Sequence, residues 1–217
     1  ILQESLPEIM MVGAQTSFAP LPIPGKLAYL AGGNAWIIDT STANRTALVT
    51  TGDLDGRIFK LSPNGMYLIF TRKSTKPAGQ EINTLWAVRT DGGKPFSTGL
   101  SNIVHFADWI PGTNSIAYST VEPRSTAPGW QANNDLSRYS VSTGEKRKIL
   151  DASNGGVYGW WGMTFAFSTN GRLAYAQPDG IGLVDLRSAA GIGVQRVAGG
   201  HVQPCADTAG NGRAKSL

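Results

Sequence analysis

The sequence is poor in cysteine, in charged residues and in long apolar runs. It has a single cysteine, Cys205, which excludes an intramolecular disulfide and a zinc site built from cysteines. No apolar stretch approaches the ~18 residues that a transmembrane helix needs. Only 16% of the residues are charged, whereas glycine (27) and proline (12) are plentiful. This composition favours an all-β, turn-rich protein over a helical one.

The net charge is small and spread along the chain. The 19 basic and 15 acidic residues give +4, and no run of five or more basic residues occurs. We therefore expect no nucleic-acid partner.

One short unit recurs along the chain, and its clearest copy is KLSPNGMYLIFTRK at 60–73. Pro63 fixes its own φ, and Asn64 and Gly65 tolerate the positive φ of a tight reversal. β-Branched and aromatic residues flank this turn, which predicts two short strands joined by it. Further copies are HFADWIPGTNSIAYST (105–120), TFAFSTNGRLAYAQ (164–177) and PIPGKLAYLAGG (22–33), the last without a first strand.

Each copy is followed by two further predicted strands, so the full unit has four strands and about 40–55 residues. A four-stranded repeat of this length is typical of a β-propeller blade. The predicted blades are residues 25–52, 57–100, 104–152 and 163–199. Residues 1–24 are interpreted as a proline-rich N-terminal arm or linker, and 201–217 as a flexible C-terminal tail.

The repeat resembles the WD40-like PD40 repeat of TolB-type β-propellers. The resemblance rests on S-P-N-G-x-x-φ-x-F (62–70) and L-W-x-V-x-x-D-G-G (85–93), and it covers roughly residues 25–200. Asn64 and Asn170 stand where the family normally has Asp. The resemblance implies a propeller fold and an extracytoplasmic bacterial protein, in the periplasm, on the cell surface or secreted. Its motif residues are turn and core residues, so it is poor evidence for function.

The predicted blades do not close a ring. Residues 25–200 supply 15 of the 16 strands of four blades, because blade 1 lacks its innermost strand. We expect an open arc or a segment of a larger propeller. The alternative is a closure in which Ile9–Val12, within the apolar segment 8–12, forms the missing strand.

Blade geometry assigns the loops to two faces. With the strands labelled a to d from the axis outward, the b–c loops and d–a connections share one face, and the a–b and c–d turns share the other. Insertions lengthen the b–c loops of blades 2 and 3, at 74–83 and 121–134. We call their face the insertion face and the opposite one the turn face. Long loops on a rigid scaffold concentrate binding residues.

Aromatic and basic residues gather on the insertion face and are the candidate ligand-binding residues. We expect them to be exposed and to bind a sugar, a peptide or an acidic partner. The alternative is that Trp160 and Trp161 fill the space between blades. The candidates are Trp130, Tyr158, Trp160, Trp161, Arg72, Lys73 and Arg124.

Signals for catalysis, metal or cofactor binding are weak. No G-x-S-x-G nucleophile motif is present. His105 and His201 are the only histidines, and His105 is interpreted as a core residue. Asp53-Leu54-Asp55-Gly56 resembles part of a calcium loop but lacks the downstream Glu, so a plain turn is favoured. Neither a catalytic residue nor a metal or cofactor site is predicted.

Three hypotheses about function follow. The first is a non-enzymatic extracytoplasmic propeller that binds a protein or an envelope ligand through the insertion face. The second is the propeller part of a prolyl-oligopeptidase-like hydrolase whose catalytic domain lies outside these residues. The third is a structural subunit of a larger assembly.

Overall fold

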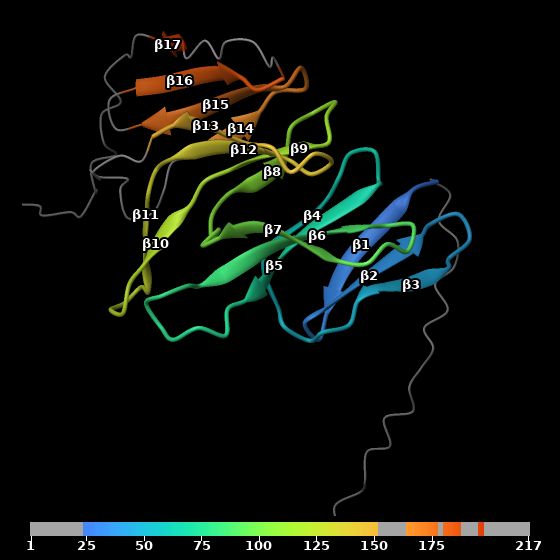
Figure 1. Ribbon diagram of the computed structural model, residues 1–217. Coiled ribbons are helices and arrows are strands. Elements are labelled where there is room, and N and C mark those ends of the chain that lie inside the picture. Colours follow the sequence, from blue (N-terminus) through green and yellow to red (C-terminus); the bar gives the residue numbers. More distant parts are fainter. Residues whose placement is uncertain (1–23, 152–163, 178–179, 188–194, 198–217) are drawn as a thin grey trace, which may run out of the picture.

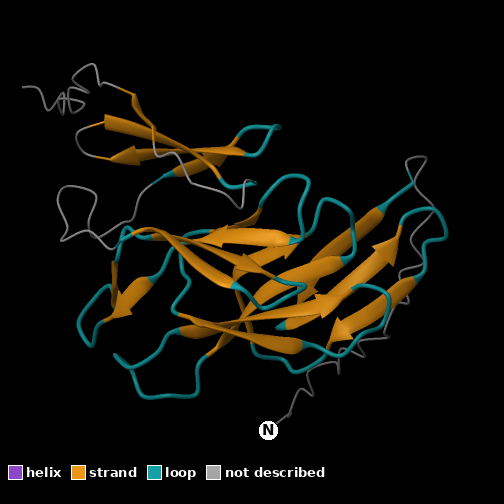
Figure 2. Cartoon of the chain, turned by 45° about the horizontal axis from the view of Figure 1, so that its top comes forward, coloured by secondary structure: helices purple, strands orange, loops and turns teal. Residues whose placement is uncertain are grey.

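The computed structural model describes residues 24–151, 164–177, 180–187 and 195–197 (Figure 1). Within these ranges it has 17 β-strands and no helix, and therefore no helix that could span a membrane. The strands form consecutive antiparallel sheets that follow one another along an open arc (Figures 1 and 2). The predicted all-β propeller architecture is confirmed.

Each sheet corresponds to one predicted blade. Blade 1 is β1(Lys26–Ala31), β2(Asn34–Asp39) and β3(Arg45–Val49). Blade 2 is β4(Leu54–Leu61), β5(Tyr67–Lys73), β6(Asn83–Arg89) and β7(Phe96–Ser101). Blade 3 is β8(Ala107–Trp109), β9(Ser115–Tyr118), β12(Leu136–Ser140) and β13(Lys146–Leu150), and β10(Val121–Pro123) and β11(Trp130–Ala132) form a separate hairpin. Blade 4 is β14(Phe165–Phe167), β15(Arg172–Gln177), β16(Gly180–Asp185) and β17(Gln195–Val197).

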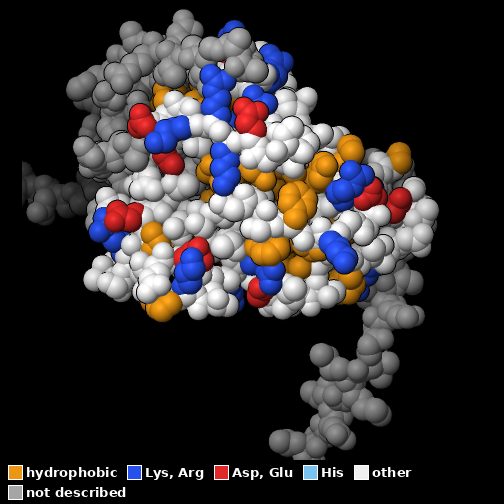
Figure 3. All heavy atoms as spheres, in the orientation of Figure 1, with side chains coloured by type: hydrophobic (Ala, Val, Ile, Leu, Met, Phe, Trp, Pro, Cys, Tyr) orange, Lys and Arg blue, Asp and Glu red, His pale blue; other side chains and the backbone are white. Residues whose placement is uncertain are grey.

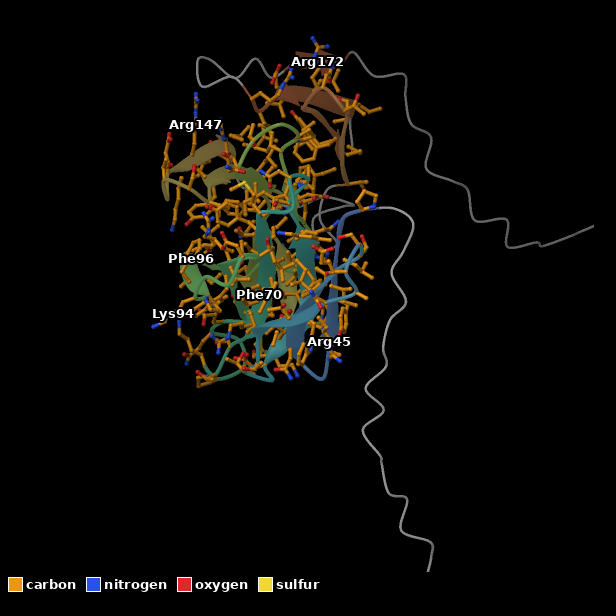
Figure 4. The ribbon with its side chains drawn as sticks, turned by 90° about the vertical axis from the view of Figure 1, so that its right-hand side faces the viewer. Arg45, Phe70, Lys94, Phe96, Arg147 and Arg172 are labelled. Atoms are coloured by element: carbon orange, nitrogen blue, oxygen red, sulfur yellow. The ribbon has the colours of Figure 1, made fainter. Side chains whose placement is uncertain are left out.

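The core lies between the blades because each inner sheet is apolar on both faces. Successive side chains of a strand point to opposite faces, and β5 shows the consequence. Leu68 and Phe70 pack against blade 1, whereas Ile69 packs against blade 3, and all three are 0% exposed. Phe70 lies deep among the packed side chains in Figure 4. Blade 2 is thus held by burial on both sides, which is the source of stability in a repeat protein.

The a–b turns have the predicted chemistry. In blade 2 the Gly65 N–H donates to the Ser62 carbonyl over 2.8 Å, and Gly65 has φ 67°. Gly171 of blade 4 makes the same bond to Ser168 over 3.0 Å, with φ 79°. Asn64 contributes through its side chain, since its Oδ1 accepts the Met66 N–H over 3.1 Å. Within the 62–65 turn, only Gly65 has a positive φ.

Blade 1 has three strands among the described residues, in the order β1-β2-β3. This agrees with the prediction that residues 25–52 lack an inner strand. The rival closure through Ile9–Val12 concerns residues outside the described ranges, as do the predicted C-terminal tail (201–217) and most of the predicted N-terminal arm (1–24).

Candidate binding surface

Two insertions of different form rise from the insertion face. In blade 2, residues 74–82 link β5 to β6 as an irregular loop. In blade 3 the inserted segment forms the β10–β11 hairpin, whose strands pair from Val121↔Ala132 to Pro123↔Trp130. In blade 1, by contrast, only two residues separate β1 from β2. The lengthened loops expected from the spacing are present, and one of them has a secondary structure of its own.

The two insertions touch each other and form a single surface. Gly79, with φ 83°, approaches the hairpin so closely that an added Cβ would lie 3.3 Å from the Ser125 nitrogen. Asn102, in the d–a connection, joins their bases. Its Oδ1 accepts the Ile82 N–H over 2.9 Å, and its carbonyl accepts the Val121 N–H over 2.9 Å. We call this surface, made of the 74–82 loop and the β10–β11 hairpin, the insertion surface.

Trp130 anchors the hairpin, and the expectation that it is exposed is wrong. Its side chain is 9% exposed and packs with Val104, Val121 and Ile82. His105 meets it edge-on, with ring centroids 4.3 Å apart. A two-stranded hairpin is marginal by itself, so the burial of Trp130, which pairs with Pro123 at the loop end of the hairpin, explains how the hairpin is held. Whether Trp130 also contacts a ligand stays a prediction.

The predicted arginines are paired with acidic or amide groups of their own surface. Arg72 makes a two-nitrogen contact with Asp53, Nη2 and Nε lying 2.7 and 2.8 Å from Oδ2, and its guanidinium lies 4.6 Å from the Trp86 ring centroid. Arg124 Nη2 donates to Glu122 Oε2 and to Gln131 Oε1, each over 2.8 Å. Sequence spacing gave no sign of the Asp53 partner, which lies 19 residues from Arg72.

Lys73 differs from these arginines. It is exposed at the end of β5, and within the described ranges its ammonium makes no ion pair. Among the basic candidates Arg72, Lys73 and Arg124, Lys73 is therefore the one best placed to meet an anionic group. Figure 3 shows several basic side chains that lie beside acidic ones on one face of the molecule.

Charge pairing also shapes the 74–82 loop. Lys76 Nζ lies 2.9 Å from Glu81 Oε2, and the Ser74 hydroxyl donates to Glu81 Oε1 over 2.7 Å. The hydrogen bond from Lys76, and to a smaller extent the one from Ser74, holds the pKa of the Glu81 carboxyl below its ordinary value of 4.5. The loop is closed by a backbone bond from Ser74 N to Ile82 O over 3.0 Å. These contacts give the loop a defined shape.

The Asp53–Gly56 segment is not the plain turn that we expected, because Leu54, Asp55 and Gly56 belong to β4. The Asp55 side chain is only 9% exposed and accepts hydrogen bonds from Thr71 Oγ1, from Asn83 Nδ2 and from the Arg57 backbone. Asn83 in turn bonds both backbone groups of Ile103. Together these bonds tie the start of β4 to β5, β6 and the next d–a connection. No group of three or more His, Cys, Asp or Glu side chains in the described part of the chain is placed to hold a metal ion.

His105 is not the core residue that its position suggested. It is exposed and lies two residues before β8. Partial burial of the ring, and to a smaller extent the positive charge of Arg57, lowers the pKa of His105 below 6.5. His105 thus contacts the insertion surface through Trp130, and the sequence pattern did not single out Arg57 as its charged neighbour.

The turn face has hollows of its own. One, of about 270 Å³, is lined by Pro63, Asn64 and the Gly112–Asn114 turn of the next blade. Asn64 Nδ2 donates to Asn114 Oδ1 over 3.0 Å, so the two turns are bonded to each other there. A second hollow, of about 260 Å³, lies between the same turn and Lys26. Both are lined mainly by residues that build turns.

Tyr158, Trp160 and Trp161 lie outside the described residues, and so does His201. Their predicted roles stay predictions. The described members of the candidate set, Arg72, Lys73, Arg124 and Trp130, lie on or beside the insertion surface.

Comparison with known proteins shows the fold. No protein-family model matches the sequence, and no curated protein matches it, so the PD40 resemblance is not confirmed. Dipeptidyl peptidase 4 of Porphyromonas gingivalis is similar to this chain at TM-score 0.56 and 16% identity, over 82% of this chain and 32% of that one. Oligopeptidase B of Leishmania major is similar at TM-score 0.50 and 14% identity, over 79% and 28%. An auxiliary nutrient binding protein of Bacteroides ovatus has TM-score 0.47 and 12% identity, over 82% and 40%.

The two peptidases contain β-propellers, which agrees with the blade architecture. At such low identity the likeness is one of fold alone. The chain spans less than half the length of each of these structures.

Proposed function

We propose that this chain is a non-enzymatic, extracytoplasmic propeller segment that binds a protein or an envelope ligand through the insertion surface. The observation that carries the proposal is the contact between the two insertions at Gly79 and Ser125. Because these loops meet, blades 2 and 3 present one broad surface. Blade 1, with its two-residue b–c turn, adds nothing comparable.

The chemistry of the surface favours an anionic group on the ligand. Lys73 is exposed, and the chain carries an overall charge of +4. A carboxylate near Lys73 would gain a charge-assisted contact without breaking an existing pair. Carboxylates are present both on acidic protein segments and on the peptide stems of envelope polymers, so either source fits this chemistry.

Charge reversal at Lys73 tests the proposal. The probes are a fluorescently labelled oligoglutamate peptide and soluble peptidoglycan fragments, and binding is measured by anisotropy or calorimetry. Lys73→Glu should weaken binding by about tenfold, since reversing one surface charge changes the interaction by about 1–2 kcal/mol. The matched control is Lys94→Glu, because Lys94 is exposed on the turn face (Figure 4). Equal losses for both variants would show general electrostatics and would contradict the surface assignment.

A second candidate function is favoured by the structural neighbours. Two of the similar structures, each with a TM-score of at least 0.50, are peptidases, and this chain matches about a third or less of each. On this proposal the chain is the propeller part of a peptidase whose catalytic domain lies elsewhere in the polypeptide. The reading frame around these residues distinguishes the two functions. A G-x-S-x-G segment within an α/β-hydrolase pattern would favour the peptidase.

A further inference from the structure

The inner strand of blade 2 contains a bulge near its start. Two successive ladder pairs, Leu54 with Arg72 and Phe59 with Phe70, leave the segment 55–58 with a single residue of β5 opposite it. The inner strands β8 and β14 of blades 3 and 4 pair with their neighbours without a register shift. A β-bulge re-aims side chains and is common beside functional sites. The side chains that this bulge presents are therefore candidates for binding.

The bulge places an acidic side chain inside and a basic one outside. The Asp55 side chain is 9% exposed and that of Arg57 is 43% exposed. Gly56 stands between them with φ 73°, a conformation that glycine adopts without strain. Asp55 Oδ2 accepts a hydrogen bond from Asn83 Nδ2 over 3.0 Å, and Arg57 Nε lies 4.0 Å from the same oxygen. This is the one ion pair of Arg57 among the described residues, so most of its N–H donors face solvent.

Asn83 connects the bulge to two further donors. It pairs with Lys73 across the ladder, so the two side chains project from the same face of blade 2. The Asn83 side chain also bonds both backbone groups of Ile103, over 2.8 and 2.9 Å. His105 follows two residues later and is exposed, with its ring against Trp130. In the part of the chain that the structure describes, neither the Lys73 ammonium nor the His105 ring has a hydrogen-bond partner.

The charge balance around Asn83 is positive. The Asp55 carboxylate already accepts hydrogen bonds from the Asn83 amide and from the Arg57 backbone. Arg57 and Lys73 each carry a positive charge at the exposed side of this network. The lowered pKa of His105 leaves its ring neutral at pH 7, with one N–H to donate. Two cations and a neutral donor thus stand around one buried carboxylate.

We propose that Arg57, Lys73 and His105 together bind a carboxylate group of the ligand where blades 2 and 3 meet. The site lies at the base of the 74–82 loop, which begins after Lys73 and ends before Asn83. Arg57 supplies N–H donors whose spacing matches the two oxygens of a carboxylate. Lys73 adds a point charge, and His105 adds a directional N–H. The inference rests on the proposed function and names the residues that recognise the anion.

Titration of the full 217-residue chain tests the site. The probes are the labelled oligoglutamate peptide and soluble peptidoglycan fragments, with oligoglutamine as the uncharged counterpart that should not bind. Arg57→Gln should weaken binding of the carboxylate probes by about three- to fivefold, the range of an exposed ion pair. The matched control is Arg89→Gln. Arg89 is 46% exposed and paired with Asp91, much as Arg57 is with Asp55, but it ends β6 at the turn face. Its change should leave binding as it is.

His105 provides a second readout. His105→Phe keeps an aromatic ring against Trp130 but removes the N–H, and it should weaken binding by about threefold. In the parent chain the imidazole resonances of His105 should shift as the probe saturates the site. Equal urea midpoints for the parent chain and the variants would show that these losses do not come from unfolding.

The results separate this inference from the proposed function. Equal effects of Arg57→Gln and Arg89→Gln would overturn the site, and so would unshifted His105 resonances at saturation. If Lys73→Glu still weakens binding in that case, the proposed function stands without this site. No effect of Lys73→Glu, or equal binding of oligoglutamine, would contradict both. Binding of only one carboxylate probe, with the losses at Arg57 and His105, would support the site and identify the source of the carboxylate as protein or envelope polymer.

Discussion

The rings of Phe106 and Phe165 stack with centroids 4.5 Å apart and an interplanar angle of 23°. Phe165 is in the inner strand β14, and Phe106 immediately precedes the inner strand β8. Phe165 pairs with Tyr175 as Ala107 pairs with Tyr118, so Phe106 lies one residue before the blade-3 position equivalent to Phe165. Their contact is part of the apolar cluster that holds blade 4 against blade 3.

We expect this stack to contribute measurably to stability. Both rings are only partly buried, so each Phe→Ala change should cost about 2–3 kcal/mol, at or below the lower end for phenylalanine in a core. A double-mutant cycle in urea should give a coupling of about 1 kcal/mol between the two rings. The control is Met66→Ala, because Met66 is 41% exposed and should lose little. Additive losses at Phe106 and Phe165 would show that the rings do not interact.

The b–c turn of blade 1 leads to a second prediction. Gly33 has φ 72°, and an added Cβ would lie 2.3 Å from the Gly52 carbonyl oxygen. Gly52 has a similar φ of 75° but open space around its Cα. Both Gly→Ala changes incur the left-handed backbone cost of about 1–2 kcal/mol, and Gly33→Ala should lose clearly more because backbone must move. Equal free energies of unfolding for the two variants would refute the close approach.

The contact between the insertions can be tested in the same way. Gly79→Ala should disturb it, because its Cβ meets Ser125 at 3.3 Å, whereas Gly129→Ala meets nothing within 4 Å. Their φ values of 83° and 93° are comparable. We expect faster amide exchange at both the 74–82 loop and the hairpin in Gly79→Ala, and a smaller change in Gly129→Ala. A change confined to the mutated insertion would mean that the two loops act separately.

A pH dependence follows from Glu81. Its pKa is lowered in the folded protein, so its ionised form stabilises the loop at a pH above the ordinary value of 4.5. That contribution is lost as the pH falls through the lowered pKa of the folded state. NMR titration of the Glu81 carboxyl should give a pKa below 4.5, and Lys76→Met should raise it. A value at or above 4.5 in the parent chain would contradict the ion pair.

The blades could be predicted from sequence because their signals are local. The turn around Gly65 needs a positive φ, and the alternation along Leu68, Ile69 and Phe70 follows from burial on both faces. Each signal sits within a few residues.

Whether each candidate side chain is ion-paired or buried could not be predicted, because this depends on residues far away in the sequence. Arg72 is neutralised by Asp53, and Trp130 is covered by residues from both insertions and a d–a connection. Asn102 joins these parts with φ 59°, a conformation that its local sequence does not demand. Spacing along the chain predicted which loops are lengthened, and long-range contacts decided which of their side chains face solvent.

On the proposed function, the insertion surface and not the turn face contacts the ligand. The most direct measurement is amide chemical-shift mapping of the full chain during titration with the oligoglutamate peptide and with soluble peptidoglycan fragments. We expect shifts concentrated at Lys73, in the 74–82 loop and in the β10–β11 hairpin. Shifts concentrated instead around Pro63, Asn64 and Asn114, where the turn face is hollowed, would contradict it.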